Sequence, residues 1–359
     1  MPVSDRTALE AAVFFELGGR AVSAETVGSG HINDTFALTV EKPASNAFVR
    51  FVLQRINPHV FPNPLSVMDN IVRVTRHLRE KYSVLPDAER RVLTVVPAKD
   101  ATPGWFDESG ACWRCYRMIE GANTVDAVRE PAQARTASFA FARFARDLSD
   151  LPPPRLQETI PAFHDTPARL QALDAVVAED RLGRAPSAAR ELAEINAMRH
   201  LAPLITDAFA AGLIPERITH NDTKINNVML DTVTGEGICV VDLDTVMPGL
   251  APYDFGDLVR VAANPAREDA GRLNHLDARR DMYDACAEGF QAGFDGYLTE
   301  QEIKLMPVAG AVITFELAVR FLSDYLDGDR YFKTARPGHN LDRARTQITL
   351  AGSLEKLAC

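Results

Sequence analysis

Two short segments, His220–Asn227 and Ile238–Asp244, constrain the fold of this chain more than any other feature of its sequence. Between them lie a short apolar run and a turn-rich stretch, residues 231–237, that contains two glycines. Two apolar runs around a glycine-containing turn are typical of a β-hairpin. Because a hairpin brings its two open ends together, we expect Asn227 and Asp242 to lie side by side.

The polar residues at the ends of this hairpin are those that a kinase uses. Asp222, two residues after His220, can orient an attacking hydroxyl group and accept its proton. Asn227 follows five residues later and Asp242 twenty residues after Asp222, and the two can hold a Mg²⁺ ion that bridges nucleotide phosphates. Lys224 either neutralises charge on the transferred phosphoryl group or is a solvent-facing loop lysine. The order and spacing of the set predict phosphoryl transfer.

Length, charge and cysteine use limit the class of protein. A chain of 359 residues suggests two subdomains, and its formal net charge of −10 argues against general binding to nucleic acid or to an anionic membrane. The apolar stretch Met306–Val319 is interrupted by Glu316 and is expected to be a core helix. We expect a cytoplasmic protein without an obligate protein partner. Five cysteines fit a reducing compartment, and Cys112 and Cys115 lie within a strand pattern that makes them structural.

The patterns along the chain predict an α+β, bilobal, protein-kinase-like fold. Strand patterns dominate the N-terminal part, with a short amphipathic helix expected at Ala8–Leu17. A second helix is expected at Pro64–Lys81 because its apolar residues share one face. After Gly121 the sequence becomes rich in alanine and charged residues and is mostly helical. We therefore expect a small nucleotide-covering lobe at 1–116, a hinge at 117–121, and a larger lobe at 122–359 that carries the catalytic and substrate sites.

The N-terminal part offers several candidates for nucleotide binding. Gly28, Ser29 and Gly30 lie between two strand patterns and form either a phosphate-covering loop or an ordinary hairpin turn. The strand at Phe48–Ile56 has no lysine where a kinase keeps the one that pairs with the phosphates. Gln54 and Arg55 stand in this region instead, and Asp69 is the acidic residue of the next helix best placed to meet the strand. In the expected hinge, Met118 and Ile119 are assigned to the nucleotide.

Other polar residues have both a structural and a functional interpretation. Asp254 lies in an Asp-Phe-Gly string but does not follow a strand, so we expect it to cap a helix or to accept backbone N–H bonds from the catalytic loop. Glu316, Arg320 and Asp324 are each four residues apart on an apolar helix. They form either a structural ion ladder or part of a polyol pocket. The expected substrate residues are His31, Asn33, Phe255, Arg320 and Asp324.

The sequence resembles the aminoglycoside phosphotransferase/choline kinase superfamily and, within it, the N-acetylhexosamine 1-kinases. The superfamily resemblance rests on His220, Asp222, Asn227 and Asp242. The closer one rests on longer strings that run nearly from end to end: Gly30–Asn33, Val52–Arg55, Phe163–Pro167, His220–Asn227, Asp242–Gly249, Asp254–Asp257, Arg320–Asp329 and Asn340–Gln347. The absence of a lysine beside Gln54 is shared with the N-acetylhexosamine 1-kinases.

The resemblance implies ATP- and Mg²⁺-dependent phosphorylation of the anomeric hydroxyl of N-acetylglucosamine or N-acetylgalactosamine. It implies Asp222 as the base and Asn227 and Asp242 as the metal ligands. Two alternatives stay open from the sequence. One is a kinase of the same fold for another sugar, an aminoglycoside or an amino alcohol, and the other is a nucleotide-binding pseudokinase, which the missing lysine alone favours.

Overall fold

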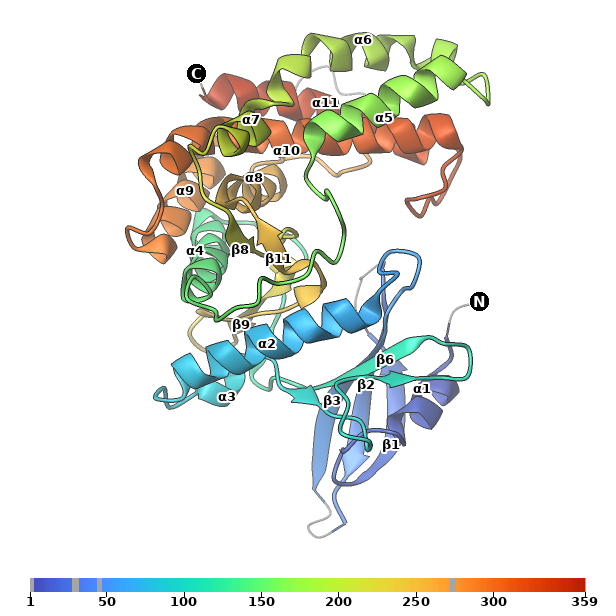
Figure 1. The fold of residues 1–359 in the computed structure, drawn as a ribbon, viewed down its shortest axis with the longest axis vertical. Coiled ribbons are helices and arrows are strands. Elements are labelled where there is room, and N and C mark those ends of the chain that lie inside the picture. Colours follow the sequence, from blue (N-terminus) through green and yellow to red (C-terminus); the bar gives the residue numbers. More distant parts are fainter. Residues whose placement is uncertain (1–2, 28–31, 44–46, 272–275, 359) are drawn as a thin grey trace. The chain divides into compact units, whose positions relative to one another are not determined.

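The chain forms two compact units in the computed structural model, which describes residues 3–27, 32–43, 47–271 and 276–358. The first unit consists of Met1–Asn123, Asp150–Pro161 and Met229–Met247, and the second of Thr124–Ser149, Ala162–Val228 and Pro248–Cys359. A sheet dominates the first unit and helices dominate the second (Figure 1). This confirms the predicted α+β class, with a β-rich N-terminal region and a helical C-terminal part. The predicted lobe boundaries and the hinge at 117–121 stay predictions.

The main sheet of the first unit is antiparallel, in the order β1-β2-β3-β6-β4, and β5 also pairs with β6. Its strands are β1 (Arg20–Thr26), β2 (Asp34–Glu41), β3 (Phe48–Arg55), β4 (Val95–Val96), β5 (Trp105–Phe106) and β6 (Cys112–Arg117). Strands β2 and β3 pair over their whole length, from Asp34 opposite Arg55 to Glu41 opposite Phe48. Because side chains alternate between the two faces of a strand, Phe36, Leu38 and Val40 point to one buried core.

Two helices of the first unit were expected at their places in the sequence. Helix α1 (Asp5–Ala12) packs on β1. It begins before the predicted Ala8, because Ser4 caps it by accepting a hydrogen bond from the Thr7 amide, and it ends at Ala12, before the predicted Leu17. Helix α2 (Pro64–Tyr82) follows the prediction closely. Its predicted apolar face is buried, as the exposure of Val67, Ile71, Val74 and Leu78 shows.

Helix α2 also anchors two distant parts of the first unit through one buried side chain. The Asn70 amide donates to the carbonyl of Gln157 at 2.8 Å and to that of Val246 at 3.0 Å. Its oxygen accepts the Gln157 amide at 3.0 Å. The segment 150–161 and the end of the hairpin region are therefore fixed to one helix, although they lie 87 and 176 residues away in the sequence.

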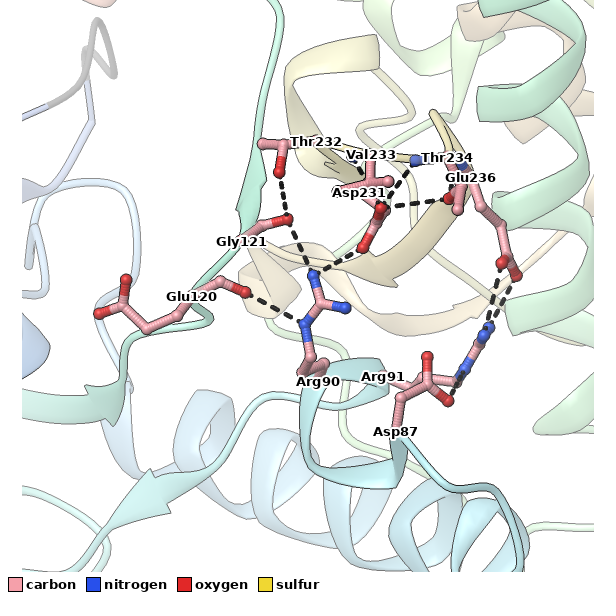
Figure 2. Close-up of polar contacts among 10 residues, drawn as sticks. All are labelled: Asp87, Arg90, Arg91, Glu120, Gly121, Asp231, Thr232, Val233, Thr234 and Glu236. Carbon is pink, nitrogen blue, oxygen red and sulfur yellow. Dashed lines mark hydrogen bonds and ion pairs between the residues drawn. The ribbon is translucent and has the colours of Figure 1, made fainter.

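The predicted hairpin is confirmed as β9 (Val228–Asp231) and β10 (Gly237–Val240), and β7 (Ala122–Asn123) adds a third strand to it. Figure 2 shows how the short helix α3 (Ala88–Arg91) contacts the turn between β9 and β10. Arg90 donates to the carbonyl of Gly121 and to the carboxylate of Asp231, each at 2.8 Å. Arg91 bonds Glu236 at 2.8 Å and Asp87 at 2.7 Å. Two adjacent arginines thus clamp the β9–β10 turn to α3.

The second unit is built from eight helices and several short elements in the part of the chain that the structure describes. The helices are α4 (Pro131–Asp147), α5 (Thr166–Glu179), α6 (Ala189–Ala197), α7 (Leu204–Ala210), α8 (Ala251–Ala262), α9 (Arg280–Phe294), α10 (Glu300–Asp327) and α11 (His339–Ala358). The short elements of the chain are β8 (Arg217–Thr219), β11 (Met247–Gly249), η1 (Ala185–Ala188), η2 (Arg199–Leu201), η3 (Ile225–Asn227) and η4 (Leu243–Thr245), the last of which belongs to the first unit.

Helix α10 is the core of the second unit. It packs against α5, α8 and α11, and Figure 1 shows α10 and α11 running side by side. A capping box of Thr299 and Glu302 starts it, and Gly328 ends it in the left-handed conformation. Among the described residues it is the one helix long and apolar enough to cross a membrane by length and composition, and 72% of its apolar window is buried. This burial agrees with the core helix predicted around Met306–Val319.

Helices α4 and α9 approach each other closely because two glycines of α9 face α4. A Cβ atom at Gly289 would lie 2.3 Å from the carbonyl oxygen of Arg135, and one at Gly293 would lie 2.6 Å from the Cβ of Ala142. These distances are shorter than van der Waals contact, so any side chain at either position must push the helices apart.

We expect Gly289→Ala to lower the free energy of unfolding by about 1–3 kcal/mol, because the added methyl group overpacks the α4–α9 contact. Urea denaturation followed by circular dichroism measures this. Gly352→Ala on α11 is the matched control, since a Cβ there meets nothing within 4 Å. The control should gain about 0.5–1 kcal/mol from reduced chain entropy. Equal stability of Gly289→Ala and the wild type would refute the close approach.

Candidate active site

The loop that carries Asp222 follows β8 and starts with a buried histidine. The ring of His220 has no exposed surface and packs edge-on against Phe141 and Phe144. Asn221 has a φ of 64°, a left-handed conformation that costs about 1 kcal/mol in a residue other than glycine. The backbone of this loop is therefore held in shape by its surroundings.

Asp254, at the first turn of α8, provides one of these restraints. Its carboxylate accepts the backbone N–H groups of His220 and Asn221, each at 2.8 Å, and its carbonyl accepts the Thr223 hydroxyl at 2.7 Å. Burial raises the pKa of Asp254 to about 7, although the two amide donors oppose the rise. The predicted role of Asp254 as an acceptor for the catalytic loop is confirmed.

His164 provides the second restraint, from the loop before α5. One ring nitrogen lies 3.0 Å from the Glu316 carboxylate of α10 and the other lies 3.3 Å from the Asn221 carbonyl. Glu316 also accepts the Thr166 hydroxyl at 2.7 Å. Burial opposes a charge on His164, but Glu316 outweighs it and raises the pKa of the imidazole. The Asn221 peptide is thus bonded through its N–H to Asp254 and through its carbonyl to His164.

The predicted catalytic residues of the second unit lie together on this loop. The Lys224 ammonium is 2.7 Å from the Asp222 carboxylate, and both side chains are partly exposed, at 43% and 25%. Burial alone would raise the pKa of Asp222, but Lys224 outweighs it and lowers the pKa below its ordinary value. The Asn227 amide group donates to the main-chain and side-chain oxygens of Asp222, at 2.9 and 3.2 Å. These bonds leave the Asn227 carbonyl oxygen as the acceptor end of the side chain.

Asp242 ends the hairpin in the first unit and adopts a left-handed conformation, with a φ of 58°. It starts the turn η4, which contains the buried Asp244. The Asp244 carboxylate pairs with Arg114 of β6 and accepts the Asn33 amide at 2.7 Å. Asn227 belongs to the second unit and Asp242 to the first, so their pairing as metal ligands stays a prediction.

The residues proposed in place of the β3 lysine have partners in the first unit. Gln54 accepts a hydrogen bond from Arg114 at 2.9 Å and donates to Thr35 at 3.0 Å. Arg55 pairs with Asp34 at 3.1 Å. Asp69 accepts a hydrogen bond from Gln157 at 3.4 Å, and among the described residues no hydrogen bond joins it to β3. The nucleotide contacts of Gln54 and Arg55 stay predictions.

The expected hinge and glycine loop are described in part. The Met118 amide bonds the Arg50 carbonyl at 3.1 Å, and Ile119 is buried in a small apolar cluster with Ile238 and Cys239. Gly28, Ser29, Gly30 and His31 lie outside the described residues.

The expected substrate residues of the second unit have different surroundings. Phe255 is fully buried against Tyr283 and Phe290, so in this structure it packs the core and has no surface for a substrate. Asp324 is buried, and its carboxylate accepts bonds from the backbone amides of residues 330–332 and from Asn340. Arg320 is only partly buried, and its guanidinium group lies over three aromatic rings: Phe163 at 5.3 Å, Tyr331 at 5.6 Å and Phe332 at 5.5 Å.

The stripe Glu316, Arg320 and Asp324 is therefore not a ladder of mutual ion pairs. Glu316 supports His164, and Asp324 folds the loop at 328–332. That loop places Tyr331, 56% exposed, beside Arg320. A series of contacts links Arg320 to the catalytic loop: Arg320 lies over Phe163, whose ring centre is 4.5 Å from that of His164, and His164 contacts Asn221.

The motifs of the sequence do not indicate the partners of Arg114, Asp244 and His164. The role of Arg114 could have been suspected, since a charged residue inside the strand Cys112–Arg117 requires a buried partner. Cys112 and Cys115 of this strand are free, buried thiols with raised pKa values, about 11 for Cys112, as expected of structural cysteines. No group of three or more His, Cys, Asp or Glu side chains among the described residues could hold a metal ion. The predicted pair of Asn227 and Asp242 is of another kind, because magnesium at nucleotides takes few protein ligands.

The sheet of the first unit and the helices of the second give the chain a protein-kinase-like fold. Three solved structures share the fold, each at low sequence identity. An aminoglycoside phosphotransferase from Alicyclobacillus acidocaldarius is 14% identical with a TM-score of 0.58, covering 100% of this chain and 95% of its own. A spectinomycin phosphotransferase in complex with ADP and spectinomycin is 12% identical with a TM-score of 0.58, covering 99% and 100%. A microcompartment-associated aminopropanol kinase is 15% identical with a TM-score of 0.56, covering 98% and 96%.

A family model described as the phosphotransferase enzyme family matches residues 23–288, about three quarters of the sequence. The chain belongs to this family.

The buried pair of His164 and Glu316 predicts a pH-dependent stability. Because its pKa is raised in the folded state, His164 stabilises the fold fully below its ordinary value of 6.5, and this contribution is lost as the pH rises through the raised pKa. Glu316 has a lowered pKa, so its contribution is present above its ordinary value of 4.5. We expect Glu316→Gln to lower the free energy of unfolding by about 1.5–3 kcal/mol between these values, and by less at higher pH.

Urea denaturation of the wild type and Glu316→Gln between pH 5 and pH 8.5 measures this difference. Glu355→Gln, which removes the exposed partner of His200, is the control and should change stability by less than about 1 kcal/mol. A difference for Glu316→Gln that is constant across the range would show that His164 does not change charge there.

Proposed function

We propose that this protein is a sugar kinase that transfers the γ-phosphoryl group of Mg·ATP to the anomeric hydroxyl of N-acetylglucosamine or N-acetylgalactosamine. The observation that carries the proposal is the loop in which the Lys224 ammonium and the Asn227 amide both contact Asp222. Membership in the phosphotransferase family supports the reaction class. The solved spectinomycin phosphotransferase contains ADP, which supports a nucleotide donor. The choice of sugar rests on the resemblance of the longer sequence strings.

Asp222 orients the acceptor hydroxyl in this mechanism. The new bond joins the acceptor oxygen to the γ-phosphorus atom, the bond from that atom to the β,γ-bridging oxygen breaks, and the hydroxyl proton passes late to Asp222. A carboxylate with a lowered pKa is a weak base, so its main contribution is alignment of the hydroxyl group. Lys224 faces the same carboxylate and supplies positive charge near the phosphoryl group in transfer.

The donor set fits Mg²⁺, because Asn227 offers an amide oxygen and Asp242 a carboxylate, and hard oxygen ligands suit this ion. When bound, Mg²⁺ would neutralise charge on the phosphate oxygens. Asn227 is kept in one orientation by its two hydrogen bonds to Asp222, so the base and this ligand are positioned together. Gly28, Ser29, Gly30, Gln54, Arg55, Met118 and Ile119 are proposed to bind the nucleotide.

The partly buried Arg320 favours an uncharged acceptor. Through Phe163 and His164 it is linked to the loop of Asp222, and its guanidinium group, with Tyr331, offers hydrogen-bond donors to sugar oxygens. A cationic aminoglycoside or amino alcohol would be repelled by this guanidinium group. His31 and Asn33 are proposed to contact the sugar from the first unit, and Asp324 acts by folding the loop that carries Tyr331.

The test is ADP release with Mg·ATP against a panel of free sugars, aminoglycosides and amino alcohols, with the product identified by phosphorus NMR. We expect a sugar 1-phosphate from an N-acetylhexosamine. ADP release with a different acceptor only would support the kinase activity and refute an N-acetylhexosamine as the substrate. Binding of ATP without release for any acceptor would instead favour a pseudokinase.

Asp222→Asn should lower kcat by a factor of about 10²–10⁴, because it removes the proton acceptor, while KM for the sugar stays within about threefold. Steady-state kinetics with the best acceptor of the panel measure both constants. Asp281→Asn, which changes an exposed aspartate on α9, is the control and should behave as wild type. Near-normal kcat in Asp222→Asn would move the catalytic base elsewhere.

A further inference from the structure

Strand β3 lacks the lysine that kinases use to pair with the nucleotide phosphates, and the first unit has a buried cation one strand away. Gln54 on β3 lies opposite Arg114 on β6 in the antiparallel register. Arg114 has 1% of its side chain exposed and is among the largest fully buried side chains of the described chain. A buried guanidinium group must have partners that compensate its charge, because desolvation of an unpaired charge is very unfavourable.

Two side-chain contacts of Arg114 join strand β3 to the turn that follows Asp242. Its Nε donates to Gln54 at 2.9 Å and its Nη1 pairs with Asp244, whose side chain is 4% exposed. The ring of Tyr116 lies 5.4 Å from its guanidinium carbon. Burial opposes the charge of Arg114, but Asp244 outweighs it, and Asp242 adds to the same effect, so the pKa of Arg114 is raised. Arg114 therefore carries a permanent positive charge within the electrostatic reach of Asp242.

Asp244 also forms hydrogen bonds that fix the turn η4 in place. Besides Arg114, its carboxylate accepts the Asn33 amide at 2.7 Å, and its carbonyl accepts the Thr159 hydroxyl at 2.8 Å. Asn33 in turn accepts the backbone amide of Asn57 at 3.0 Å. The turn η4 is thereby bonded to the residue before β2, to the residues after β3 and to the segment 150–161. Asp242, in its left-handed conformation, is the residue before this fixed turn.

We propose that Arg114 is the positioning cation of the Mg·nucleoside triphosphate site, in place of the lysine that β3 lacks. It acts through Asp244, which fixes the turn η4 and so the carboxylate of Asp242, and through Gln54, whose amide it orients. The inference rests on the proposed function, since it assigns Asp242 to the metal-bound nucleotide.

An arginine suits this position better than a lysine would. The guanidinium group offers separate N–H donors in a fixed plane, so Nε and Nη1 reach Gln54 and Asp244 at the same time. A lysine ammonium is a single point and cannot hold both partners in one geometry. A merely structural ion pair would need no such link between β3 and the Asp242 turn.

The test uses four variants of the full chain. Arg114→Lys keeps the charge and loses the fork, and Asp244→Asn keeps the shape and loses the charge. The double variant Arg114→Met with Asp244→Leu removes both charges, so that neither is left buried alone and the fold is retained. Arg20→Met, which removes an exposed ion pair with Glu41 in the same sheet, is the matched control.

Isothermal titration calorimetry gives the dissociation constants for Mg·ATP and for ADP without metal, and thermal unfolding reports the fold of each variant. We expect the Mg·ATP constant to rise at least tenfold in the double variant and in Asp244→Asn, and several-fold in Arg114→Lys. The constant for metal-free ADP should change less than threefold, and the Mg²⁺ concentration for half-maximal turnover should rise. Arg20→Met should match the wild type.

Unchanged Mg·ATP binding in a folded double variant would overturn the proposal, and so would an equal loss of Mg·ATP and metal-free ADP, which is the result of a general loosening of the sheet. A wild-type protein that binds neither nucleotide would instead refute the proposed function. The two failures are thus distinguishable.

Discussion

A buried carboxylate fixes each of the two turns on which the candidate chemistry depends. Asp254 accepts both backbone amides that precede Asp222, and Asp244 joins the turn after Asp242 to Arg114 of the sheet. Asn221 and Asp242 are both in the left-handed conformation, which is unfavourable for side chains other than glycine. In each unit, then, a buried carboxylate with several hydrogen bonds fixes the backbone at a strained residue or close beside it.

Two ion pairs around these turns bring together segments that are distant in the sequence. His164 and Glu316 are 152 residues apart and Arg114 and Asp244 are 130 apart, yet the second pair is buried and the first is nearly so. Burial of charge is unfavourable in itself, and removal of one partner leaves the other unpaired. Such pairs therefore add less to net stability than to the choice of one geometry, which is what a catalytic loop requires.

Local patterns in the sequence were sufficient to predict the elements, and they failed for the long-range contacts. The hairpin of β9 and β10 and the buried face of α2 follow from apolar periodicity and turn residues, so both were predictable. Phe255 was an expected substrate residue, but no local pattern shows that α8 buries it against Phe290 of α9. The roles of Arg114 and His164 depend on partners more than 100 residues away, for which a single sequence carries no periodic signal.

The arginine clamp of Figure 2 and the Arg114–Asp244 pair hold opposite ends of the same hairpin, and they differ in access to water. Glu236 of the clamp is 49% exposed, so dissolved ions weaken its attraction to Arg91, whereas the pair at the other end is shielded from them. Dissolved salt should therefore weaken the Arg91–Glu236 contact at the β9–β10 turn more than the Arg114–Asp244 pair at the other end of the hairpin.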